Sequence, residues 1–159
     1  MCNYTMCMSD DPALSSLSPF DQMLCFDVYA VNLAFGRIYK PLLDPLGLTY
    51  PQFLVMMALW ANDHQSVGGI GDSLGLDSST LTPLIKRLEA ANLVTRQRDS
   101  RDERRVIVSL SPQGADLQSQ SERVIACVTG NTGLDDRTAQ ALREQLRRLR
   151  HQLQQSPQG

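Results

Sequence analysis

The sequence predicts a mainly α-helical protein that carries one small β-hairpin, with its elements in the order ααααββαα. Two observations support this fold class. Apolar residues recur at steps of three and four through most of the 159 residues, which is the period of a helix with one buried face. The period changes to two only once, between residues 93 and 110, as in paired strands. With 42% hydrophobic residues, the chain can bury one core.

Four helices are expected before the hairpin, because each apolar stripe begins beside a residue that caps helices. Such a residue accepts a hydrogen bond from a backbone N–H of the first turn, and proline suits the first helical position. The four expected starts are Ser18-Pro19, Thr49 with Pro51, Ser66, and Asp77 or Ser78. The first helix is expected to run about six turns to Leu42, the third to close at Gly75, and the fourth to end near Asn92.

The hairpin and two further helices complete the predicted order. The strands cover residues 93–97 and 105–110, around a tip at 99–102. After Ser111-Pro112 the pattern is helical again to about Thr129, and a break at 131–133 precedes a last helix from Leu134 to Gln154. Apolar residues are few on this last helix. A helix of this length with so thin a stripe is expected to pack against another chain.

The start of the chain has neither the basic nor the apolar region of a signal peptide. No apolar run approaches the roughly 18 to 20 residues that span a bilayer. We therefore expect no membrane partner and a cytoplasmic, reducing location, where Cys2, Cys7, Cys25 and Cys127 are free thiols. Cys2 and Cys7 lie in a polar, mobile tail and are expected to have no role.

The region from Ser78 to Arg105 is basic, although the chain is not. It holds seven Lys/Arg and four Asp/Glu, against a net charge of −2 for the whole protein. Helix, turn and helix before a basic hairpin form a winged helix-turn-helix, whose second helix enters the major groove of DNA while the wing reaches the neighbouring minor groove. A solvated helix face followed by a charged hairpin is the alternative, and it does not explain this order of elements. The expected DNA-binding residues are Ser78, Ser79, Thr80, Thr82, Pro83, Lys86 and Arg87 on the helix, and Arg98, Arg101, Arg104 and Arg105 on the wing.

The residues from Leu76 to Glu89 and from Asp99 to Arg104 closely resemble those of the MarR family of transcriptional regulators. Within that family they are most similar to the organic-hydroperoxide-resistance (OhrR) type, over about residues 18–150. The resemblance implies an obligate homodimer that binds double-stranded operator DNA and represses a peroxide-detoxification gene. It implies a tail at residues 1–17, a helical dimerisation region at 18–48 and 112–155, and a DNA-binding region at 49–111.

Cys25 lies on the predicted first helix, where a cysteine is most often a small core residue. No Lys, Arg or His is near it in sequence, so an activated thiolate would need other donors, such as phenol hydroxyls. Tyr39 follows by 14 residues on the same helix, a separation of roughly 21 Å. It can therefore reach only the thiol of a partner whose first helix crosses over. The resemblance places Cys25, Tyr39 and Tyr50 on the family's reactive cysteine and its two hydrogen-bonding tyrosines.

Cys127 lies near the end of the fifth predicted helix. A buried structural thiol is one interpretation. The resemblance to a two-cysteine subclass implies instead that Cys127 captures the sulfenic acid of the partner's Cys25 in an intersubunit disulfide, a reversible product.

We therefore expect a transcriptional repressor, not an enzyme, that an organic hydroperoxide releases from DNA. An alternative with the same fold is a repressor released by a small phenolic or carboxylate ligand without redox chemistry. A thiol peroxidase is a further alternative, but the chain lacks the Thr and Arg neighbours that would activate a peroxide beside Cys25. His64 and His151 have no metal-ligand companions at useful spacing, so we expect no metal and no cofactor.

Overall fold

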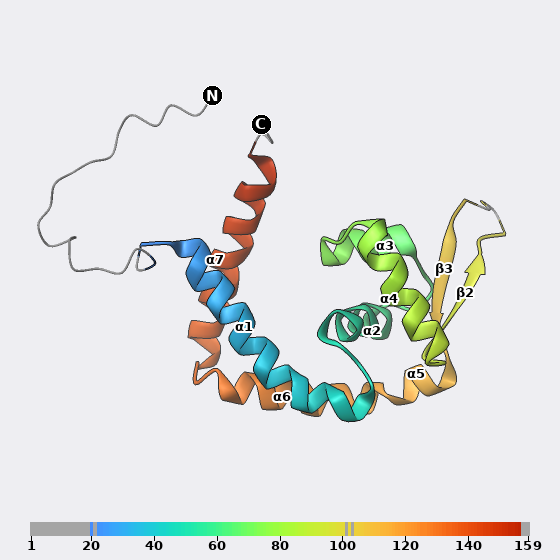
Figure 1. Ribbon diagram of the computed structural model, residues 1–159, viewed down its shortest axis with the longest axis horizontal. Coiled ribbons are helices and arrows are strands. Elements are labelled where there is room, and N and C mark those ends of the chain that lie inside the picture. The colour runs from blue at the N-terminus through green and yellow to red at the C-terminus, as the bar shows by residue number, and fades with distance from the viewer. Residues whose placement is uncertain (1–19, 21, 101, 103, 157–159) are drawn as a thin grey trace, which may run out of the picture. The chain divides into compact units, whose positions relative to one another are not determined.

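The computed structural model (Figure 1) describes residues 20, 22–100, 102 and 104–156. The expected tail (residues 1–17), the expected helix start at Ser18-Pro19, Cys2, Cys7 and Arg101 lie outside the described residues. The chain divides into two compact units, Met1–Phe35 and Gly36–Gly159. The first helix contributes residues to both units.

The observed elements confirm a mainly helical protein with a small β wing. Three features were not predicted: a 3-10 turn after the first helix, a two-residue strand before the third, and the division of the fifth helix into two. In chain order the elements are α1 (Leu24–Leu43), η2 (Asp44–Leu46), α2 (Tyr50–Ala61), β1 (Gln65–Ser66), α3 (Val67–Leu74), α4 (Ser78–Ala90), β2 (Val94–Arg98), β3 (Val106–Leu110), α5 (Pro112–Asp116), α6 (Gln118–Asn131) and α7 (Asp136–Gln155).

In the first unit, α1 begins at Leu24, later than the predicted start at Ser18-Pro19. The backbone N–H of Met23 donates to the carbonyl of Phe20 at 3.0 Å, which closes a turn before the helix. The ring of Phe20 then packs against that of Phe26, with 4.9 Å between the centroids. The carbonyl of Met23 accepts from Asp27 at 3.2 Å, the first bond of helical spacing. A turn and an aromatic contact thus precede the helix at a position where the sequence pattern predicted helix.

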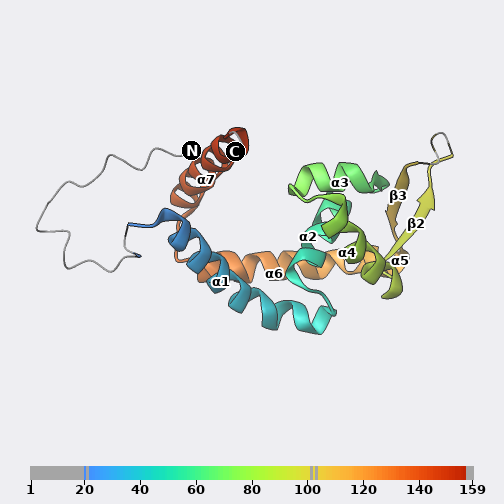
Figure 2. The same cartoon turned by 45° about the horizontal axis from the view of Figure 1, so that its top comes forward.

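In the second unit, α2, α3 and α4 form a helical cluster beside the sheet, and the β2–β3 hairpin extends from it (Figure 2). The core of this cluster is apolar and fully enclosed. Its most deeply buried side chains are Phe53, Val55, Met56, Leu59, Ile70, Leu81, Ile85, Leu88, Val94 and Val108. Because α4 turns only Leu81, Ile85 and Leu88 inward, its opposite side faces solvent.

The predicted capping residues begin the helices of this unit. The side chain of Gln52 accepts from the backbone N–H of Thr49 at 2.8 Å at the start of α2. The hydroxyl of Ser66 accepts from the N–H of Gly69 at 3.1 Å at the start of α3. The turn after α3 is tight, since a Cβ added to Gly71 would lie 2.7 Å from the carbonyl oxygen of Leu76. At least one of the three glycines of this helix is thus required by a close backbone approach.

The strands form an antiparallel sheet in the order β1-β3-β2. Val108 in the central strand pairs with Gln65 on one side and with Arg96 on the other. The sequence did not predict β1 because two residues show no periodicity, and this strand exists through its pairing with β3.

The predicted fifth helix is interrupted at Leu117 and becomes α5 and α6. The indole Nε1–H of Trp60 donates to the carbonyl of Gly114 at 2.9 Å. That carbonyl is the acceptor that the N–H of residue 118 would use in an unbroken helix. The bond from Trp60 therefore lies at the break, which the local sequence does not indicate.

Helix α7 has no buried residue. Three of its leucines are exposed: Leu142 at 44%, Leu146 at 45% and Leu153 at 66%. Within the described residues no single helix has the length and apolar character to cross a membrane. Only Leu24–Leu46 with Tyr50–Ala61, bent by 69°, meets those criteria as a pair, by length and composition alone.

Candidate functional site

The start of α4 carries a network of hydrogen bonds centred on Asp77. Its Oδ1 accepts from the backbone N–H of Thr80 at 2.8 Å and from the hydroxyl of Ser79 at 2.5 Å. Its Oδ2 accepts from the hydroxyl of Thr80 at 3.2 Å. The bond from the Ser79 hydroxyl and the bond from the Thr80 backbone hold the pKa of Asp77 below its usual 3.8, because they favour the charged form. At neutral pH this carboxylate can therefore only accept hydrogen bonds.

The residues of α4 that the sequence predicted to bind DNA lie on its solvent side. Thr82 is half-buried, and its hydroxyl donates to the carbonyl of Ser78 at 2.7 Å. The others are exposed: Ser78, Ser79, Thr80, Pro83, Lys86 and Arg87. The helix thus holds its polar and cationic residues away from its buried apolar residues.

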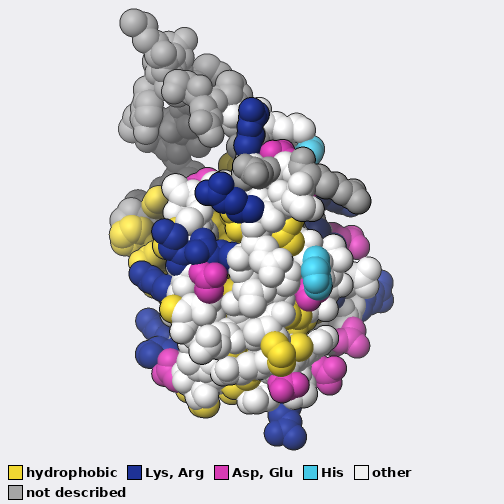
Figure 3. Space-filling view, turned by 90° about the vertical axis from the view of Figure 1, so that its right-hand side faces the viewer, with side chains coloured by type: hydrophobic (Ala, Val, Ile, Leu, Met, Phe, Trp, Pro, Cys, Tyr) yellow, Lys and Arg dark blue, Asp and Glu magenta, His cyan; other side chains and the backbone are white. Residues whose placement is uncertain are grey.

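The wing places its described arginines in solvent, namely Arg98, Arg104 and Arg105. Bonds close to its tip hold its backbone. The N–H of Asp99 donates to the carbonyl of Arg105 at 2.9 Å, and the N–H of Arg104 donates to Oδ1 of Asp102 at 3.1 Å. Figure 3 shows dark-blue Lys and Arg side chains on the face of the molecule that includes the hairpin.

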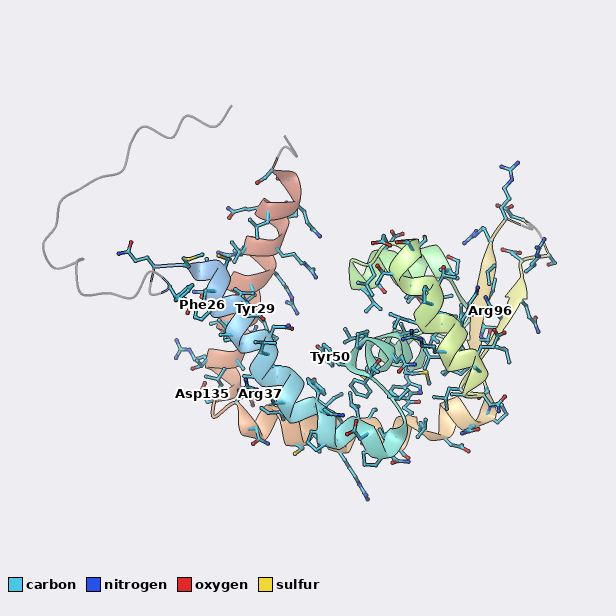
Figure 4. All side chains as sticks on the ribbon, in the orientation of Figure 1. Phe26, Tyr29, Arg37, Tyr50, Arg96 and Asp135 are labelled. Atoms are coloured by element: carbon cyan, nitrogen blue, oxygen red, sulfur yellow. The ribbon has the colours of Figure 1, made fainter. Side chains whose placement is uncertain are left out.

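Arg96 was not among the predicted site residues, yet it joins the wing to α4. Its Nε–H donates to Oε2 of Glu89 at 2.7 Å, and Figure 4 labels it on the hairpin. The alternation along β2 could have indicated this, since Arg96 shares a strand face with the buried Val94. Beside it is a hollow of about 350 Å³ lined by Ser66, Val67, Gly68, Ser78, Thr82, Arg96, Arg104, Arg105 and Val106. Three guanidinium groups border this hollow, so it is suited to an anion.

Tyr39 and Tyr50, predicted as thiol-activating residues, lie together in the second unit. Their ring centroids are 4.5 Å apart, and both rings border a hollow of about 210 Å³ that also includes Gly36, Leu43 and Leu48. Burial raises the pKa of both phenols above the usual 10.0, and the neighbouring Tyr50 raises that of Tyr39 further. Both are therefore protonated donors at neutral pH. Among the described residues, neither hydroxyl has a hydrogen-bond partner.

The two described cysteines are exposed free thiols. Cys25 lies in the first unit, on α1, which continues unbroken through Tyr39. Cys25 and Tyr39 are therefore 14 residues apart on one helix. Cys127 lies on α6, where the side-chain N–H of Asn131 donates to its carbonyl at 2.8 Å and approaches its Sγ to 3.7 Å. Because both cysteines are exposed, neither is a core residue of the single chain.

Across the described part of the chain, His, Cys, Asp and Glu side chains form no group of three or more that could hold a metal ion.

Comparisons with known proteins show which family the chain belongs to. Residues 37–121 match the model of the transcriptional regulator SarA/Rot family. The chain is 44% identical over 144 residues to the HTH-type transcriptional regulator TtmR of Methylorubrum extorquens, covering 91% of this chain and 71% of the relative. It is 42% identical over 110 residues to the organic hydroperoxide resistance transcriptional regulator of Bacillus subtilis, covering 69% of this chain and 75% of the relative. The chain belongs to the OhrR-type regulators of the MarR family.

Solved structures agree with this membership. Reduced AbfR bound to DNA matches with a TM-score of 0.71 and 34% identity, over 82% of this chain and 92% of that one. A disulfide-formed AbfR matches with a TM-score of 0.60 at 34% identity, over 83% and 90%. MarR from E. coli shares the fold, with a TM-score of 0.62 at 23% identity, over 79% of this chain and 95% of that one. This OhrR-type chain is therefore a transcriptional regulator, and its relatives are regulators rather than enzymes.

Proposed function

We propose that this regulator is a homodimeric repressor that binds operator DNA when reduced and leaves it when an organic hydroperoxide oxidises Cys25. The observation that supports oxidation of Cys25 as the signal is the pair formed by Tyr39 and Tyr50. Two protonated phenols meet at 4.5 Å, and neither hydroxyl has a partner within the described residues. A thiolate presented to them would receive two hydrogen bonds, which favour its charged form.

The thiolate that fits this pair is Cys25 of the partner subunit. The chain's own Cys25 lies roughly 21 Å from Tyr39 along α1. Exposed apolar residues support a dimer, because a monomer would leave them in water. They occur on α1 (Leu24 59%, Phe26 40%, Val28 43%, Val31 54%) and on α7 (Leu142 44%, Leu146 45%). The same apolar surroundings of Cys25 would favour alkyl or lipid hydroperoxides over hydrogen peroxide.

The proposed oxidation of Cys25 and its capture by Cys127 proceed in two steps. The Cys25 thiolate attacks the terminal oxygen of the hydroperoxide, the O–O bond breaks, and the alcohol leaves after taking a proton, so that Cys25 becomes a sulfenic acid. The thiol of Cys127 from the other subunit then attacks that sulfur and water departs, leaving an intersubunit disulfide. Exposure of both thiols supports this condensation. The two sulfurs must approach each other, so the tyrosine hydrogen bonds break. The two winged domains then move away from the separation at which both can bind the operator.

DNA binding uses the exposed side of α4 and the wing. In a two-fold dimer the two α4 helices would enter successive major grooves, about 34 Å apart. Lys86, Arg87 and the wing arginines would contact phosphates, and the hydroxyl residues at the start of α4 would reach base edges. AbfR, which shares about a third of its residues with this chain, has been solved on DNA in both its reduced and its overoxidized form.

The alternative of release by a carboxylate ligand has less support. A hollow of about 380 Å³ lies between η2, the end of α4 and α5, where such a ligand would need a cation. Its described lining is Pro45, Leu46, Gly47, Ala91, Leu93, Gln113, Asp116, Leu117 and Gln120. This lining offers one carboxylate and no Lys or Arg, so it would repel an anionic ligand. The hollow that is suited to an anion, bordered by Arg96, Arg104 and Arg105, lies instead on the side of α4 and the wing that we propose binds DNA.

The test begins with a duplex selected from a random pool by the reduced protein. Fluorescence anisotropy then follows release by one equivalent of cumene hydroperoxide. Wild type should dissociate and form a disulfide-linked dimer on a non-reducing gel. Cys25→Ser should stay bound and uncross-linked, and Cys127→Ser should reach the sulfenic acid without the dimer band. Peroxide-driven release of Cys25→Ser would remove this thiol from the mechanism.

A further inference from the structure

Three of the four hydroxyl groups at the start of α4, those of Ser79, Thr80 and Thr82, have their protons committed inside the protein. Ser79 and Thr80 donate to the two oxygens of Asp77, at 2.5 Å and 3.2 Å. Thr82 donates to the carbonyl of Ser78 at 2.7 Å. The direction of each bond is set by its acceptor, because neither an ionised carboxylate nor a carbonyl carries a proton to give. The lowered pKa of Asp77 keeps its carboxylate in this form at neutral pH.

A hydroxyl whose proton is donated inward presents only oxygen lone pairs to its surroundings. Ser79 and Thr80 are exposed and Thr82 is half-buried. The first turn of α4 therefore offers acceptors, and the bonds to Asp77 are charge-assisted, which makes them costly to reverse. The cationic donors of this helix stand one turn later, at Lys86 and Arg87.

The major groove contains few groups that can donate to these acceptors. Its hydrogen-bond donors are the N6 amine of adenine and the N4 amine of cytosine, whereas guanine and thymine present acceptors at O6, N7 and O4. We infer that Ser79, Thr80 and Thr82 read exocyclic amines in the operator, and that Asp77 is the positioning residue that sets their polarity. This inference rests on the proposed DNA binding, and it goes beyond it by naming the chemistry of the bases that are read.

Asp77→Asn isolates the role of the carboxylate. The amide oxygen can still accept from the N–H of Thr80 and from Ser79, so the helix keeps its cap. The amide nitrogen takes the place of Oδ2 and donates to the hydroxyl of Thr80. That hydroxyl must then turn its own proton outward and become a donor to DNA. The substitution should therefore invert the base preference at the position facing Thr80, from an amine to the O6 or O4 of guanine or thymine, and leave the preference at Ser79 unchanged.

The experiment uses the full-length reduced protein and the duplex that it selects. Each adenine of a half-site is replaced by purine and each cytosine by pyrimidin-2-one, which removes one exocyclic amine at a time. Loss of an amine under the first turn of α4 should weaken wild-type binding by about three- to tenfold. Replacing purines with their 7-deaza analogues removes an acceptor instead and should have no effect at those positions. A repeated selection with Asp77→Asn should then show the inverted base.

Two further variants keep the test decisive. Asp135 caps α7 in the same way, accepting from the N–H of Thr138 at 2.7 Å, so Asp135→Asn makes the same chemical change away from α4 and should retain the wild-type base preference. Should Asp77→Asn unfold, Thr80→Val removes the hydroxyl alone and should abolish discrimination at one position. Unchanged selectivity in Asp77→Asn and Thr80→Val, with no effect of amine removal, would overturn the inference while DNA binding stands. Failure of the reduced wild type to select any duplex would reject the proposed function itself.

Discussion

Arg96 of β2 donates its Nε–H to Oε2 of Glu89 on α4 at 2.7 Å, so one ion pair ties the wing to the helix that would enter the major groove. The side chains are 29% and 36% exposed. A partly exposed pair of this kind contributes at most about 1 kcal/mol to folding. Its larger effect should be on the position of the wing relative to α4.

Glu89→Gln should therefore weaken DNA binding while lowering the free energy of unfolding by less than about 1 kcal/mol. The change removes a negative charge, which by simple electrostatics would strengthen binding to DNA. A weaker affinity can thus arise only from lost positioning of Arg96. Anisotropy at several salt concentrations measures it, and tighter binding by Glu89→Gln would show that the ion pair does not orient the wing.

Gly114 should tolerate no side chain. A Cβ at this position would lie 1.9 Å from the carbonyl oxygen of Leu93, a backbone atom that cannot move away alone. Gly114→Ala should lower the free energy of unfolding by at least about 2 kcal/mol, measured by urea denaturation. Gly130→Ala is the matched control, because nothing lies within 4 Å of its added Cβ and alanine favours a helix by about 0.5–1 kcal/mol. Equal stabilities of the two variants would contradict the packing argument.

These cases show which parts of the structure the sequence could predict. The caps at Thr49, Ser66 and Asp77 follow from chemistry within four residues, so the starts of α2, α3 and α4 were predicted correctly. Beside the break between α5 and α6, Gly114 accepts a hydrogen bond from Trp60, 54 residues away. A periodic pattern in α6 carries no information about such a contact.

In the candidate site, too, the sequence could predict some features and not others. The exposed side of α4 follows from the helical period, since its buried residues recur at steps of three and four. The meeting of Tyr39 and Tyr50 does not, because η2 lies between their helices and sets the angle of the turn. Only the resemblance to OhrR-type regulators grouped them. The sequence likewise did not predict that two hydroxyl groups donate to Asp77, although it did predict a capping role for this residue.

The tyrosine pair should make stability fall in alkaline solution. Burial raises the folded-state pKa of both phenols above the usual 10.0. The stabilisation is fully present below the unfolded-state pKa near 10 and is lost as pH rises through the higher folded-state pKa. Urea midpoints measured between about pH 8 and pH 11 should therefore decline, and less steeply in Tyr39→Phe and Tyr50→Phe. Tyr29→Phe, at a ring that is 58% exposed, should retain the wild-type decline. An identical decline in all variants would contradict the assignment.

The leucines of α7 should hold the dimer together. Leu142 and Leu146 are 44% and 45% exposed in the single chain and lie one turn apart, so they form one apolar stripe. Leu146→Asp would place a carboxylate in the proposed interface twice, because a two-fold dimer repeats each contact. At about 2 kcal/mol or more per copy for a central residue, dissociation should be evident by sedimentation at micromolar concentration. DNA affinity should fall with it, since two half-sites require two linked α4 helices. His151→Glu introduces the same type of charge at an exposed position away from this stripe and should leave the dimer intact. A Leu146→Asp protein that remains dimeric and binds DNA normally would move the interface away from α7.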